Sequence, residues 1–78
     1  MEYQKVIKDS GLSVYEIDDL IEKWIFSERD RYILKRIILD GICYEKVSEE
    51  IGMSVRQTKR IAISRMKILI KHIEKEPK

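Results

Sequence analysis

Side chains suited to binding a polyanion are concentrated in one short stretch of this sequence, Arg56, Gln57, Lys59 and Arg60. A guanidinium group presents a planar fork of donors that fits a phosphate or the edge of a guanine, whereas an ammonium group supplies a point charge for phosphate. These residue types therefore indicate recognition of nucleic acid through hydrogen bonds and ion pairs. The alternative for the same residues is an ordinary solvated helix face.

Two short helices around a tight turn are predicted to position this cluster. The turn is Gly52-Met53-Ser54 within residues 43–63. Gly52 can adopt a positive φ just past a helix, Ser54 can cap the next helix, and Gln57 can bond back to Ser54 in a capping box. The apolar residues expected to hold the two helices together are Val47, Ile51, Met53 and Ile61. This is the layout of a helix-turn-helix.

The charge of the chain changes sign where the second of these helices begins. Residues 1–55 carry eight Lys/Arg and twelve Asp/Glu, a net charge of −4, whereas residues 56–78 carry eight and two, a net charge of +6. A concentrated basic region is typical of phosphate contact, although a solvated basic tail has the same composition. The basic region coincides with the second helix of the helix-turn-helix, which favours binding of nucleic acid over a solvated tail.

The 78 residues are predicted to form one all-α domain, a small bundle of four to five helices. Ser13 with Glu16 makes a capping box, and Ser27 with Asp30 marks a further helix start. The expected helices are residues 3–9, 13–25, 27–40, 44–51 and a long last one, 55–74. Residues 1–12 form a short helix or arm, 13–42 supporting helices, and 43–74 the helix-turn-helix.

Other kinds of site have little support in the sequence. One cysteine, Cys43, and one histidine, His72, cannot supply the four ligands of a structural zinc site. No set of catalytic side chains can be assembled, so neither an enzyme nor a cofactor is expected. No apolar run approaches the ~20 residues of a membrane span, and a single cysteine suits a reducing compartment. A cytoplasmic, nucleoid-associated protein is expected.

Residues 27–69 resemble region 4 of bacterial sigma factors and the small phage regulators built on the same module. The scaffold segment YEKVSEEI, the turn GMS and the segment VRQTKR carry the resemblance. Phage regulators of the autolysin-regulatory (ArpU-like) type are closest in size and style. Two positions depart from the family pattern, Ser48 in place of Ala or Gly and Cys43 at the cap. Regions 2 and 3 of a sigma factor are absent, which favours a free-standing regulator.

The resemblance and the helical wheel together imply contacts with double-stranded DNA. The residues expected to face base edges in the major groove are Val55, Arg56, Lys59, Arg60 and Ile63. The residues expected to contact phosphate are Tyr44, Lys46, Ser54, Gln57, Ser64, Lys67 and Lys71.

The expected function is that of a sequence-specific transcriptional regulator of phage or mobile-element genes. The alternative is an anti-sigma or RNA-polymerase-binding adaptor with the same fold. A homodimer is a further expectation, because one recognition helix gives limited specificity. Its surface would be the apolar edge Ile63, Met66, Ile70 and Ile73, or else Trp24 and Phe26. The alternative is that an N-terminal helix bearing Val6 and Ile7 covers this edge.

Overall fold

Five α-helices and one π-helical turn make up the fold within residues 3–75, the part of the chain that the computed structural model describes. They are α1 (Tyr3–Lys8), α2 (Val14–Trp24), α3 (Glu28–Leu34), the π-turn η1 (Lys35–Leu39), α4 (Tyr44–Ile51) and α5 (Val55–Lys75). The prediction of an all-α bundle containing a helix-turn-helix with a long last helix is confirmed. None of these helices is both long and apolar enough to cross a bilayer.

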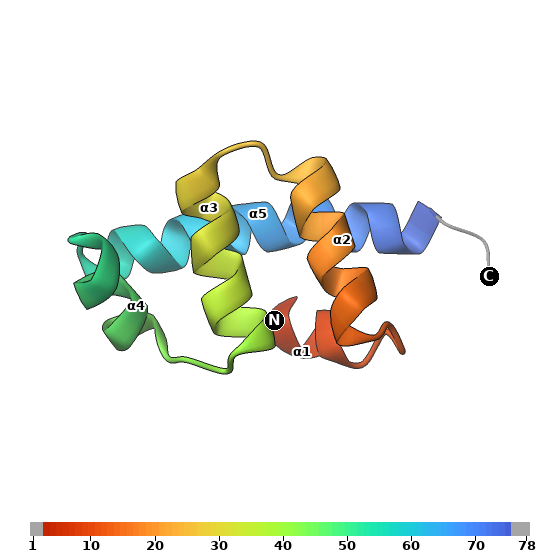
Figure 1. The fold of residues 1–78 in the computed structure, drawn as a ribbon, viewed down its shortest axis with the longest axis horizontal. Helices are drawn as coiled ribbons and strands as arrows, with labels where there is room; N and C mark the ends of the chain where they lie inside the picture. Colours follow the sequence, from red (N-terminus) through yellow and green to blue (C-terminus); the bar gives the residue numbers. More distant parts are fainter. Residues whose placement is uncertain (1–2, 76–78) are drawn as a thin grey trace.

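The longest helix, α5, is the axis around which the others pack. Its 21 residues span about 31 Å at 1.5 Å per residue, most of the 38 Å length of the molecule. Helices α2 and α3 cross it, and α4 lies at the end where α5 begins (Figure 1). Helix α4 and the first turns of α5 therefore form one end of the protein.

Each element contributes apolar side chains to a single core. The buried ones are Ile7, Ile17, Ile21, Ile25, Ile33, Leu34, Ile37, Ile38, Val47, Ala62, Met66 and Leu69. Burying a side chain of the size of Ile or Leu stabilises a fold by roughly 1.5–3 kcal/mol.

The starts of α2 and α3 are as predicted. Ser13 and Glu16 form the complete capping box of α2, and Ser27 caps α3.

The π-turn η1 departs from the continuous helix predicted over residues 27–40. The amide of Asp40 donates to the carbonyl of Lys35, five residues earlier, at 3.1 Å. The side-chain amide of Gln4 in α1 donates to the Ile37 carbonyl in this turn at 2.9 Å. The turn therefore supplies a backbone acceptor that ties α1 to the centre of the fold.

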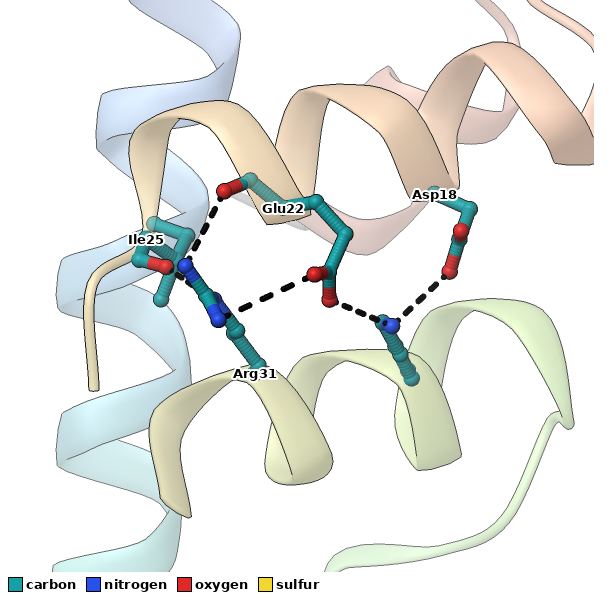
Figure 2. A network of polar contacts seen from close by, with 5 residues as sticks. Asp18, Glu22, Ile25 and Arg31 are labelled. Carbon is teal, nitrogen blue, oxygen red and sulfur yellow. Dashed lines mark hydrogen bonds and ion pairs between the residues drawn. The ribbon is translucent and has the colours of Figure 1, made fainter. Parts of the chain in front are cut away.

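A network of ions joins α2 to α3 and η1 (Figure 2). The Lys35 ammonium lies 2.6 Å from Glu22 and 3.1 Å from Asp18. Its hydrogen bond holds the pKa of Glu22 below the ordinary value. The Arg31 guanidinium donates to the carbonyls of Glu22 and Ile25, which stand at the unpaired C-terminal end of α2. These two cations of the α3–η1 segment are thus neutralised within the protein.

A buried carboxylate joins α3 to α5. The side chain of Asp30 is only 2% exposed, and its oxygens lie 2.8 Å from Arg65 and 3.4 Å from Arg29. A carboxylate so far from water requires such partners, because desolvation strongly disfavours an unpaired charge. Asp30 was expected only to occupy the first turn of its helix, and its structural role was missed.

Helix α4 is held against η1 by one carboxylate. Glu50 accepts two hydrogen bonds from Arg36, at 2.6 and 3.1 Å, and one from the Tyr32 hydroxyl at 2.9 Å. Bidentate pairs of this kind are among the stronger surface interactions. Chiefly because of the Arg36 hydrogen bonds, the pKa of Glu50 lies below its usual 4.5. Ionised Glu50 therefore contributes to holding α4 against α3 and η1.

The substitution Glu50→Gln is expected to lower the free energy of unfolding at neutral pH but not in acid. A carboxyl whose pKa is lowered by folding stabilises the fold above its unfolded pKa, and this is lost as pH falls through the folded value. The difference from wild type should therefore shrink below about pH 4.5. Urea unfolding at about pH 7 and about pH 3 measures it. Glu49→Gln is the control, because Glu49 has no ion pair within residues 3–75, and a pH-independent deficit would contradict the assignment.

Candidate nucleic-acid interface

The turn between α4 and α5 has the predicted backbone geometry. Gly52 lies at φ 69°, ψ 33°, in the left-handed region, and its amide donates to the Ser48 carbonyl. The next amide, that of Met53, donates to the same carbonyl at 3.0 Å. No atom lies within 4 Å of a Cβ placed on Gly52, so the backbone angle alone favours glycine here.

The start of α5 is capped, but not by the full capping box predicted. The Gln57 amide donates to the Ser54 hydroxyl oxygen at 3.1 Å, as expected. The Gln57 side chain does not return to the backbone of Ser54; instead the Ser54 hydroxyl donates to its amide oxygen at 3.3 Å. The Ser54 hydroxyl thus both accepts a hydrogen bond and donates one within the cap.

Small side chains let α4 and α5 approach closely. Ser48 is 4% exposed, and its hydroxyl donates to the Glu45 carbonyl at 2.7 Å, so its polar group is satisfied inside the contact. Thr58 is fully buried and donates to the Ser54 carbonyl at 2.9 Å. Cys43 stands at the cap position of α4 but makes no side-chain cap bond and is exposed. Ser48 is therefore accommodated in the buried part of α4 with its hydroxyl hydrogen-bonded.

Most residues predicted to contact DNA lie on one exposed face at this end of the molecule. Val55 is 41% exposed, and Arg56, Lys59 and Arg60 are also exposed. Of the residues predicted to contact phosphate, Tyr44 is half-buried and the others are exposed: Lys46, Ser54, Gln57, Ser64, Lys67 and Lys71. Ile63 differs from the other predicted base contacts, because it is half-buried and lies beside α1.

Within residues 3–75, the cations at the start of α5 lack acidic partners, in contrast to the cations of α3 and η1. All four cations of residues 29–36 are in ion pairs, namely Arg29, Arg31, Lys35 and Arg36. Within residues 3–75, no ion pair involves Arg56, Lys59 or Arg60. The nearest aromatic contact is that of the Lys59 ammonium, 6.0 Å from the Tyr44 ring centroid. Positive charge is therefore neutralised on α3 and η1, whereas on α5 Arg65 is paired with Asp30 and the cations of the first turns are in no ion pair within residues 3–75.

Helix α1 completes one side of this face; from the sequence it was expected, as the alternative to a dimer, to cover the apolar edge of α5, but its lysines were not expected here. An open hollow of about 490 Å³ lies between α1, α4 and α5. Lys5 and Lys8 of α1 line it together with Tyr44, Lys59 and Ile63. The spacing of the two lysines places them on one helical face, but only the tertiary fold brings that face to α5.

The residues predicted to form a dimer surface are only partly accessible. Met66 is 1% exposed, and Trp24, Ile70 and Ile73 are half-buried against the core. Ile63 is also half-buried. The Trp24 ring stacks on His72 at 3.6 Å, whereas Phe26 is 80% exposed. Ile7 of α1 is fully buried and α1 packs on α5, so the apolar edge is largely covered within one chain.

Comparison with protein-family models, curated proteins and solved structures found no significant match to this chain. The candidate interface therefore stands on its own geometry: a capped turn, a small-residue helix crossing, and exposed cations without acidic partners. Within residues 3–75, no group of three or more His, Cys, Asp or Glu side chains is arranged to hold a metal ion.

Proposed function

We propose that this protein is a sequence-specific double-stranded DNA-binding transcriptional regulator that places α5, from Val55 onward, in the major groove. The observation that carries the proposal is the cluster of exposed cations at the capped start of α5. Arg56, Lys59 and Arg60 are exposed and unpaired within residues 3–75, although the same chain pairs every cation of residues 29–36. Phosphate neutralises such a face, and guanine accepts bidentate hydrogen bonds from arginine.

The shape of this end of the molecule supports the same proposal. A helix with its side chains is about 10–12 Å across, which suits the ~12 Å width of the major groove. Only the first turns of α5 and the adjoining α4 occupy this end, while α2 and α3 cross α5 farther along (Figure 1). The first turns of α5 therefore present Arg56 and Arg60 with the least obstruction from the rest of the fold.

The likeness of residues 27–69 to sigma-factor region 4 and to small phage regulators supports a role in transcription, in phage or mobile-element genes. In that role Lys46, Ser64, Lys67 and Lys71 bind phosphate and fix the register, while Val55, Arg56, Lys59 and Arg60 contact base edges. Two copies on neighbouring half-sites would raise the specificity that one helix provides.

Titration of the protein against a pool of random duplexes, with sequencing of the bound fraction, tests this proposal. Binding at low salt that weakens steeply with added salt, together with enrichment of a short motif, is expected. The absence of any binding at low salt would refute the proposal. Binding without enrichment would leave a non-specific DNA binder and refute sequence recognition.

A protein-binding adaptor is the second candidate, and exposed aromatic side chains favour it. Tyr15 is 86% exposed and Phe26 is 80% exposed, and neither belongs to the DNA face. Aromatic residues are enriched at protein interfaces. Capture of purified RNA polymerase or sigma factor by wild type, but not by Phe26→Ser or Tyr15→Ser, would support this function. DNA binding without capture would exclude it.

A further inference from the structure

The hollow between α1, α4 and α5 combines an apolar lining with three lysine side chains. Lys5 and Lys8 approach from α1 and Lys59 from α5, and Asp9 is the one acidic side chain among the lining residues. Within residues 3–75, none of these three lysines forms an ion pair. The hydroxyl-bearing ring of Tyr44 lies on the α4 side. Such a surface fits an anion.

Helix α1 is fixed in place and not a free arm. Ile7 is fully buried in the core, and Gln4 donates to the Ile37 carbonyl in η1 at 2.9 Å. The Lys67 ammonium lies 5.6 Å from the Tyr3 ring centroid, so α1 also contacts the exposed side of α5. Lys5 and Lys8, three residues apart, lie on one face of this anchored helix. Their charges are therefore positioned before any ligand binds.

We propose that α1 is a second phosphate-binding element, in which Lys5 and Lys8 hold the sugar-phosphate backbone that borders the groove occupied by α5. The proposal rests on the proposed function, because Tyr44, Lys59 and Ile63 belong both to the hollow and to the predicted DNA face. A backbone strand that passes Lys59 enters the hollow directly. Ile63, which is half-buried and lines the same hollow, then lies behind this strand.

Salt-dependent affinities of single-charge variants test this assignment. Each of Lys5→Gln and Lys8→Gln is expected to weaken binding to every duplex alike, by roughly threefold to tenfold, and to reduce the slope of log K against log salt by about 0.9. Lys23→Gln is the matched control, since it removes one exposed lysine of α2 outside the hollow. Helicity by circular dichroism checks that each variant is folded.

A variant that is expected to gain affinity provides a second test, because misfolding can only reduce binding. Asp9→Asn removes the one acidic side chain among the residues lining the hollow and is expected to tighten binding by roughly twofold to threefold at low salt. Wild-type binding with Lys5→Gln, Lys8→Gln and Asp9→Asn all matching the Lys23→Gln control would overturn the role of α1 and leave the proposed function standing. No binding by wild type at low salt would instead refute the proposed function, and the role of α1 with it.

Discussion

Replacement of both Arg56 and Arg60 by alanine is expected to reduce affinity for the selected duplex by on the order of a hundredfold. A bidentate arginine contact with guanine contributes about 1–3 kcal/mol, and about 1.4 kcal/mol corresponds to a factor of ten. Both side chains are exposed and form no ion pair within residues 3–75, so their removal costs the fold nothing that the structure identifies. Alanine also favours the helix.

The single variants should separate base contacts from phosphate contacts. Arg56→Ala and Arg60→Ala should each relax the preference at one position of the selected motif, whereas Lys67→Ala should weaken all sequences alike and lower the salt slope by about one unit. Fluorescence anisotropy with the motif and with single-base variants measures both effects. Lys23→Ala, which removes one cation from α2, is the control. An unchanged motif preference in both arginine variants would exclude base contact by this face.

Arg65→Met is expected to destabilise the fold by about 3 kcal/mol, more than any other change discussed. The Asp30 carboxylate, 2% exposed, would keep only Arg29 at 3.4 Å as a charged partner. A domain of this size has a total stability of roughly 4–12 kcal/mol, so the loss is a large part of it. Thermal unfolding should show a midpoint lowered by about 10–20 °C.

Two companion variants show whether the buried charge is the cause. Asp30→Asn should cost less, about 1–2 kcal/mol, because Arg65 is 41% exposed and can turn to solvent when its partner is neutral. The double variant Asp30→Leu with Arg65→Met should be more stable than Arg65→Met alone, since it removes the unpaired carboxylate. Asp30→Asn and Arg65→Met could instead lower the free energy of unfolding equally. The deeper burial of Asp30 would then not explain the cost of breaking this ion pair.

Local chemistry made most of the helices and the turn predictable. Ser13, Ser27 and Ser54 mark helix starts through hydrogen bonds to amides within the next turn, and Gly52 marks an end through its backbone angle. Each signal acts over three or four residues, so it survives in the sequence whatever the tertiary fold is. The exposed cations of α5 were predictable for the same reason, from their spacing on one helix.

The features that the sequence did not predict depend on contacts between distant residues. Asp30 looked like an ordinary first-turn acid, and only Arg65, 35 positions away, explains its burial. The wide turn η1 receives a hydrogen bond from Gln4, 33 positions away. The Gln57 side chain turned to the Ser54 hydroxyl instead of its backbone, an alternative that the same two residue types allow. The periodicity of the helices alone does not predict any of these three contacts.

The unpaired cations on α5 have a consequence for how ions in solution act on this protein. Arg56, Lys59 and Arg60 repel one another in the free protein, because no acid within residues 3–75 is paired with them. Added electrolyte screens this repulsion and so favours the folded free state, yet it weakens attachment to a polyanion. If the proposed function holds, a bound polyanion would therefore stabilise the fold, since a ligand that prefers the native state raises the population of that state by mass action.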